Sequence, residues 1–105
     1  MNEPKLKALL GFAQKSGKLV SGENGVESAL RSKKAKLLLL AADAAANTKK
    51  DYSFKAQNYQ TVYKEVLTKE ELGECIGKNY RAAVAVVDKN FAEAILALLS
   101  IQEDI

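Results

Sequence analysis

The sequence has no histidine and no tryptophan, and it has one cysteine and one proline. Without histidine, the chain lacks the commonest general base and the commonest metal ligand. The single cysteine, Cys75, cannot form an internal disulfide, and a free thiol suits a reducing cytoplasm. Cys75 has no histidine to activate it and falls at a core-facing helical position. We therefore interpret it as a packing residue.

The motifs of several large protein classes are also missing. No run approaches the roughly 20 apolar residues that a membrane span needs, and the periodic, charged first residues are unlike a secretory signal. The sequence has no glycine-rich dinucleotide motif, no Walker motif and no cysteine or histidine pair for zinc. Glu70, Glu71 and Glu74 follow one another along a single predicted helix, and surface charge explains them. We therefore expect a cytoplasmic protein that is not an enzyme and has no cofactor and no metal.

The charge is unevenly distributed along the chain. Residues 1–50 contain ten Lys or Arg and four Asp or Glu, a balance of +6, whereas residues 51–105 contain six and nine, a balance of −3. Halves of opposite sign indicate one basic face that could meet an anionic partner. An ordinary solvated surface is the alternative, and it is the simpler interpretation on charge alone.

Helical and strand patterns alternate along the sequence. Apolar residues at helical spacing predict five helices, which begin near Asn2, between Gly22 and Asn24, at Ala45, after Thr68 and after Asp88. Short apolar or β-branched runs predict four strands near residues 18–21, 36–42, 61–66 and 82–87. The order is αβαβαβαβα, which predicts helices on both faces of a central, largely parallel sheet. We expect one domain over residues 1–105, structured over 1–100, with a frayed tail at 101–105.

Side-chain caps and a core follow from the same patterns. We expect Gly17 to end the first helix, Asn47 or Thr48 to cap the third, Thr68 to form a capping box with Glu71, and Asp88 to cap the last. The helical residues expected to face the core are Leu6, Leu9, Leu10, Ala13, Val26, Ala29, Leu30, Tyr52, Ala56, Tyr59, Leu72, Cys75, Ile76, Phe91, Ile95 and Leu98.

The segment SGENG, before the second helix, has the most distinctive local chemistry. Glycines at 22 and 25 allow positive φ or a close approach of another molecule. Asn24 can cap the helix, and main-chain amides at a helix start bind phosphate. Lysines flank the segment in sequence and could neutralise a phosphate backbone; they stand at positions 15, 18, 33, 34 and 36. A plain turn and cap with solubilising lysines explains the same residues, and the residues alone leave both interpretations open.

The longer pattern resembles a known family. The stretch SGKLVSGENGVESALRSKKAKLLLLAADA, followed by VYKEVLTKEELGECIG and AAVAVVD, is similar to the kink-turn-binding ribosomal proteins of the L7Ae group, in particular the bacterial YlxQ-type branch. The likeness spans about residues 5–99, and no single motif in it is highly specific. The matching residues are Gly17, Lys18, Gly22, Asn24, Ala29, Ala41 or Ala42, Asp43, Leu72, Gly73 and Gly77.

The resemblance implies a three-layer α/β/α sandwich with a central four-stranded mixed sheet. It also implies binding of kink-turn or similarly bent structured RNA, in association with the ribosome or translation. In that family the start of the second helix enters the widened groove at G·A pairs, and the loop before the fourth helix contacts bulged nucleotides. The RNA-binding residues implied here are Lys15, Lys18, Gly22, Glu23, Asn24, Gly25, Ser28, Lys33, Lys34, Val66, Leu67, Thr68 and Lys69.

Some positions depart from the family pattern. Gly25 stands where the family commonly has Glu, Ser28 where it has Lys, and Val20 and Ser21 where basic residues are frequent. One good base contact is worth roughly 1–3 kcal/mol, by comparison with DNA recognition. The alternative function is therefore a protein-interaction module on the same fold, with weak or no RNA binding. For the main interpretation we expect a monomer whose partner is structured RNA, with neither DNA nor a membrane as a partner.

Overall fold

The computed structural model describes residues 3–103 and contains the nine elements in the predicted order. The start expected near Asn2 and the last two residues of the expected tail lie outside the described residues. The elements are α1 (Glu3–Lys15), β1 (Leu19–Ser21), α2 (Glu23–Arg31), β2 (Leu37–Leu40), α3 (Ala46–Asn58), β3 (Tyr63–Glu65), α4 (Lys69–Cys75), β4 (Ala83–Val86) and α5 (Lys89–Glu103).

The four strands form one mixed sheet in the order β1-β4-β2-β3. The pair β2–β3 is parallel, but β4 runs antiparallel to both of its neighbours, β1 and β2. The mixed sheet is confirmed, whereas the largely parallel sheet expected from the alternation is wrong. The cause lies around α4: the main-chain N–H of Arg81 donates to the carbonyl of Lys69 (3.0 Å), so the chain returns to the start of α4 before entering β4. The chain therefore enters β4 at the same end of the sheet at which β3 finishes.

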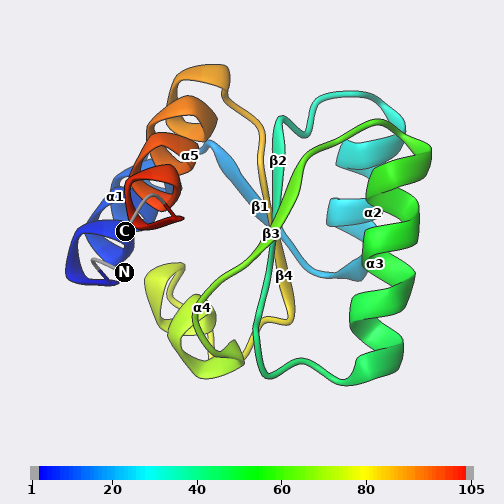
Figure 1. Cartoon of the computed structure of the whole chain (residues 1–105), viewed down its shortest axis with the longest axis horizontal. Coiled ribbons are helices and arrows are strands. Elements are labelled where there is room, and N and C mark those ends of the chain that lie inside the picture. The colour runs from blue at the N-terminus through cyan, green and yellow to red at the C-terminus, as the bar shows by residue number, and fades with distance from the viewer. Residues whose placement is uncertain (1–2, 104–105) are drawn as a thin grey trace.

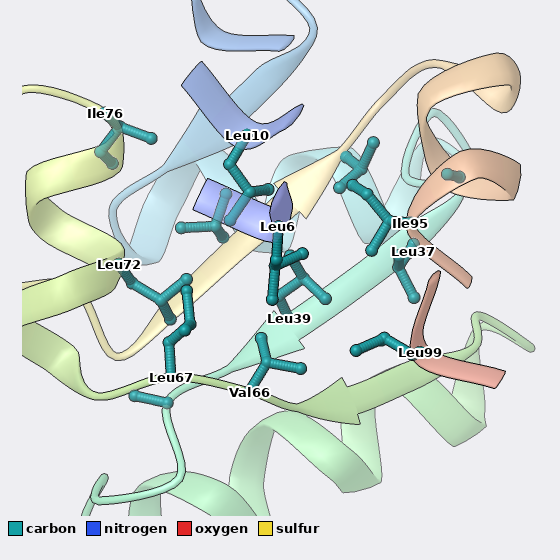
Figure 2. Packing of buried hydrophobic residues seen from close by; sticks show 14 of the residues in the cluster. Leu6, Leu10, Leu37, Leu39, Val66, Leu67, Leu72, Ile76, Ile95 and Leu99 are labelled. Carbon is teal, nitrogen blue, oxygen red and sulfur yellow. The ribbon is translucent and has the colours of Figure 1, made fainter. Parts of the chain in front are cut away.

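Helices cover both faces of the sheet. Figure 1 shows α1, α4 and α5 on one face and α2 and α3 on the other. In β2, Leu37 and Leu39 belong to the core under α1, α4 and α5, whereas Leu38 and Leu40 belong to the core under α2 and α3. Each of these leucines is at most 1% exposed, as a central strand covered on both faces requires. Figure 2 shows part of the first of these cores.

Most of the expected helix faces are buried, and three helix ends form as expected. Gly17 follows the end of α1 with φ 71°. The capping box of Thr68 and Glu71 is present, and the Asp88 carboxylate accepts a hydrogen bond from the Phe91 N–H (2.9 Å). The cap expected for α3 is wrong, because that helix begins at Ala46 and has no side-chain cap. In α5, the fully buried residues are Ala92, Ile95 and Leu99, whereas Phe91 and Leu98 are half-buried at the sides of that face. Leu9, Tyr52, Tyr59 and Cys75 are likewise half-buried, and the other expected core residues are buried.

The strand directions give the molecule two different ends. At one end, which we call the carboxyl edge, β1, β2 and β3 finish and β4 begins; it is at the bottom of Figure 1. At the other, which we call the amino edge, β1, β2 and β3 begin and β4 finishes. Within residues 3–103, no helix combines the length and apolar character that a bilayer span requires.

Candidate nucleic-acid interface

Hydrogen bonds link the four loops of the carboxyl edge into one surface. The Arg81 guanidinium, before β4, donates through Nε to the hydroxyl of Ser21 at the end of β1 (3.2 Å). The Arg81 N–H donates to the carbonyl of Lys69, and the Lys69 N–H donates to the carboxylate of Asp43 (2.7 Å), which follows β2. Residues from four separate parts of the sequence are therefore held in fixed positions around one end of the sheet.

The first turn of α2 is open. Gly22 precedes the helix with φ 87° and ψ 147°, a conformation that side-chain-bearing residues rarely adopt, and its carbonyl accepts the first helical bond from Val26 (2.9 Å). Among the described residues, none accepts a hydrogen bond from the main-chain N–H groups of Glu23, Asn24 or Gly25. The expectation that Asn24 caps the helix is wrong: it is the second residue of α2, and it is exposed. Its amide and the main-chain donors beside it are therefore free to bind a ligand.

An aromatic ring and a cation stand beside this open turn. Tyr80 is 63% exposed and, with Gly22, Glu23 and Arg81, lines a shallow cavity of about 180 Å³. The guanidinium of Arg81 is fixed by a second bond, from Nη1 to the carbonyl of Tyr80 (2.7 Å). An exposed tyrosine and an arginine suit base stacking and phosphate binding, respectively.

The loop that carries these two residues was not predicted from the sequence. It lies between Gly77 and the last strand, outside the stretches that resemble the family. The loop sequence KNYRA contains two cations and an aromatic residue between a helix end and a buried strand, and this composition was the signal available. The missed candidates are Lys78, Asn79, Tyr80 and Arg81.

Carboxylates also lie near the helix start. Glu23 and Asp51 line a second cavity, of about 200 Å³, together with Tyr52 and Lys55, between the start of α2 and α3. Burial, followed by the nearby charges of Glu23 and Glu27, raises the pKa of the Tyr52 hydroxyl, so it stays protonated and can donate a hydrogen bond. The surface is thus of mixed sign on both sides of the open turn. Lys55 lies with Glu23 and Asp51 on the α3 side, and Glu70 and Glu74 line another cavity with Lys78 and Tyr80 on the α4 side.

The lysines expected to surround the start of α2 lie at the other end of the molecule. Helix α2 has nine residues and therefore rises about 13.5 Å, which carries the turn that follows it to the amino edge. Strand β1 likewise separates Lys18 from Gly22. The expectation that lysines surround the open turn is therefore wrong. The five lysines concerned are Lys15, Lys18, Lys33, Lys34 and Lys36.

The apolar pair expected to touch bulged nucleotides is buried instead. Val66 and Leu67 are 2% and 6% exposed and belong to the core under α1, α4 and α5, as Figure 2 shows. Thr68 is half-buried, and its hydroxyl accepts a hydrogen bond from the Glu71 N–H (3.1 Å). Of this group, Lys69 remains as a cation at the carboxyl edge, and Ser28 is exposed on α2, one turn after Asn24.

Two further titratable groups, Glu71 and Cys75, serve helix capping and packing. The Lys7 amine, 2.9 Å from the Glu71 carboxylate, and then the Thr68 N–H hold the pKa of Glu71 below its ordinary value. Burial raises the pKa of the half-buried Cys75 thiol, which favours its unreactive protonated form. Within residues 3–103, no three His, Cys, Asp or Glu side chains are grouped closely enough to bind a metal ion.

The sequence is similar to those of known proteins over most of its length. The chain is 44% identical over 91 residues to RNA-binding protein YlxQ of Bacillus subtilis (strain 168), a match that covers 87% of this chain and 91% of that protein. It is 35% identical to RNA-binding protein YlxQ of Enterococcus faecium, with 93% and 94% covered. It is 34% identical to large ribosomal subunit protein eL30 of Yarrowia lipolytica, with 90% and 89% covered. None of these names is that of an enzyme.

Structural comparison agrees with the sequence comparisons. A solved structure of a protein of unknown function from Bacillus halodurans superimposes with a TM-score of 0.86 and 34% sequence identity, covering 91% of this chain and 97% of that one. Residues 4–96 match the sequence pattern that defines one family. The chain therefore belongs to the ribosomal protein L7Ae/L30e/S12e/Gadd45 family.

Proposed function

We propose that this protein binds RNA and that it recognises a kink-turn or a similarly bent structured RNA through the carboxyl edge. Two relatives that it matches over most of their length are named RNA-binding proteins, and a third is a ribosomal protein. The observation that carries the proposal is the open first turn of α2, whose main-chain donors have no partner among the described residues. An ordinary A-form major groove is too narrow to admit a helix end, so bent or irregular RNA is the substrate that fits.

Each of the following groups at the carboxyl edge has a role in this proposal. The absence of a side chain on Gly22 lets the RNA approach the main-chain donors closely. Asn24 contacts base edges with its amide, which offers two donors and an acceptor. Tyr80 stacks on an unpaired base, and Arg81 and Lys69 neutralise phosphates.

A binding assay with a matched control tests the proposal. Fluorescently labelled kink-turn RNA and a straight duplex of equal length are titrated with wild type, Asn24→Ala and Asn90→Ala. Asn90 is an exposed asparagine and also the second residue of its helix, α5, but it lies at the amino edge. We expect wild type and Asn90→Ala to prefer the kink-turn and Asn24→Ala to lose at least tenfold in kink-turn affinity. Equal affinity of wild type for the two RNAs would exclude recognition of the bend.

We further propose that the protein acts as a cytoplasmic monomer within a ribosomal or other ribonucleoprotein particle. The ribosomal relative supports this setting. Sedimentation of cell extract through a gradient tests it, because the proposal requires the protein to travel with large RNA particles and to leave them after nuclease treatment. Light scattering of the purified protein, at 11.4 kDa per chain, tests the monomer.

The alternative, a protein-interaction module with little RNA binding, has one observation in its favour. A cavity of about 390 Å³ with mainly apolar walls lies between α1 and α5, and Phe12 at its margin is 63% exposed. Purification from cells separates the two functions. Bound RNA that nuclease removes supports the RNA proposal, whereas a stoichiometric protein that remains after nuclease supports the alternative.

A further inference from the structure

The lysines that the carboxyl edge does not use form a compact group of their own. The main-chain N–H of Lys36 donates to the carbonyl of Val86 (2.7 Å), and the N–H of Val87 donates to the carbonyl of Lys18 (2.9 Å). Lys18 and Lys36 therefore flank the end of β4 on either side, with their backbones about 10 Å apart at the usual strand spacing. Lys33 and Lys34 lie in the turn just before β2, and Lys15 ends α1 three residues before Lys18.

None of these five lysines forms an ion pair recorded within the described residues. The Lys33 amine donates to the carbonyl of Tyr59 (2.6 Å), and the Lys36 amine donates to the carbonyl of Lys33 (3.2 Å). Among the described residues, none forms a hydrogen bond with the side chains of Lys15, Lys18 or Lys34, all of which are exposed. Ion pairs between described residues involve other lysines, among them Lys7, Lys49, Lys55 and Lys89.

Nearby negative charge does not balance the group. Asp88 follows β4 and accepts the capping bond of α5, and Glu93 lies 3.9 Å from the amine of Lys89. Helices α1, α2 and α3 end at this edge, and each end is equivalent to about half a negative charge. The negative end of α3 accounts for Lys33, whose amine lies at the last carbonyls of that helix. The helix ends also offset part of the positive charge of the other lysines. Lys18 and Lys34 have no such structural role.

We propose that the amino edge is a second RNA-binding surface, formed by Lys15, Lys18, Lys33, Lys34 and Lys36, which contacts the phosphate backbone of an RNA segment other than the one bound at the carboxyl edge. The proposal takes from the proposed function only that RNA is the partner. Lysine is a compact point charge that suits phosphate. Protein–protein interfaces, by contrast, are depleted of lysine, which favours a nucleic acid over an acidic protein.

The two surfaces lie at opposite ends of the strands, as the loops at the top and bottom of Figure 1 show. The molecule measures 30 × 29 × 27 Å along its principal axes, so one monomer can connect RNA segments no more than about that distance apart. Binding at the amino edge depends on charge and carries no sequence information. It would therefore add affinity within a folded particle while the carboxyl edge selects the site.

A double variant with a charge-matched control tests the second surface. Protein saturated with unlabelled kink-turn RNA is titrated with a labelled straight duplex over a series of salt concentrations. Lys18→Gln with Lys34→Gln removes two lysines whose side chains make no recorded bond; Lys5→Gln with Lys50→Gln removes the same charge from exposed sites elsewhere. We expect the first pair to lose at least fivefold in duplex affinity, with a shallower salt dependence, while kink-turn affinity stays within twofold. We expect the control pair to bind the duplex like wild type.

Two outcomes would overturn the second surface. One is that RNA-saturated wild type does not bind the duplex at low salt, and the other is that both double variants lose the same affinity. Failure of the proposed function is distinguishable from either result. If wild type binds the two RNAs equally, the proposal that it recognises the bend is wrong. A loss of duplex affinity in Lys18→Gln with Lys34→Gln, but not in the control pair, would still support RNA binding at the amino edge.

Discussion

Gly25 and Val20 pack so closely that a Cβ atom on Gly25 would lie 2.8 Å from Cγ1 of Val20. The family residue at position 25 is commonly Glu, and the residue at position 20 is often basic. Val20 is half-buried against the core under α2 and α3, so its methyl group occupies the space that a side chain at position 25 would need. A side chain at position 25 therefore requires Val20 to move or to change its rotamer.

This contact predicts the outcome of restoring a side chain at position 25. Gly25→Ala should destabilise the protein, because overpacking costs about 1–3 kcal/mol and exceeds the gain of up to about 1 kcal/mol from replacing a helical glycine. In a Val20→Ala background the clash is absent, and Gly25→Ala should be neutral or stabilising. Chemical unfolding of the four proteins of this double-mutant cycle measures the coupling. Additive effects would show that the backbone relaxes without cost.

Tyr80 offers a direct test of base stacking. Tyr80→Ala should weaken kink-turn binding by about 1–3 kcal/mol, which is the usual value of one base–aromatic stack. Tyr80→Phe should bind like wild type, since the ring and not the hydroxyl makes the contact. Phe54→Ala is the matched control, because Phe54 is 69% exposed on α3 and is not among the residues of the interface. Fluorescence anisotropy with labelled RNA measures all three variants, and equal losses in Tyr80→Ala and Phe54→Ala would contradict the prediction.

The central strand predicts a large effect on stability. Leu39→Ala should lower the free energy of unfolding by about 3 kcal/mol, because the fully buried side chain leaves a cavity in the core under α1, α4 and α5. Val62→Ala is the control, since Val62 is 50% exposed and its loss should cost little. Denaturant unfolding monitored by circular dichroism measures both. Similar losses in the two variants would mean that the packing shown in Figure 2 does not determine stability.

The capping box predicts how stability responds to acid. The pKa of Glu71 is lower in the folded protein than its ordinary value of 4.5, because its carboxylate is bound by Lys7 and by the Thr68 N–H. A lowered folded pKa contributes stability above the ordinary pKa, and this contribution is lost as the pH falls through the folded pKa. Glu71→Gln should therefore be less stable than wild type at pH 7 and should approach wild type below pH 4.5. Glu70→Gln, exposed in the same turn, is the control, and melting temperatures over a pH series provide the measurement.

The fold was predictable from the sequence wherever its physical signal is local. Apolar runs located β2 and β4, and helical spacing located all five helices. The direction of β4 was not predictable from alternation, because it depends on the return of the chain to Lys69, a contact between main-chain groups that side-chain patterns do not encode. The cap of α3 failed for a related reason: Asn47 and Thr48 are good capping residues, but the helix begins before them.

The sequence located Gly22 and Asn24 at the start of α2, but it did not show which residues lie beside them in three dimensions. Lys18 and Lys33 are near the SGENG segment in sequence, but an intervening strand and an intervening helix carry them to the opposite edge. Val66 and Leu67 are apolar residues in a loop, and the core buries them. Tyr80 and Arg81 lie more than 50 residues after Gly22, and only the antiparallel pairing of β1 with β4 brings them beside it.

The position of β4 in the sheet also has a consequence for synthesis of the protein. Strand β1 (Leu19–Ser21) pairs with residues 84–86 of β4, and β4 also pairs with one side of β2. Until translation reaches Ala83, β1 therefore has no partner strand, and β2 can be paired only with β3. Long-range pairing of this kind delays folding, and the early chain is left with unpaired strand edges. A nascent chain stalled before Ala83 should thus be protease-sensitive and dependent on chaperones. Only chains long enough for β4 to have emerged from the ribosome should resist protease.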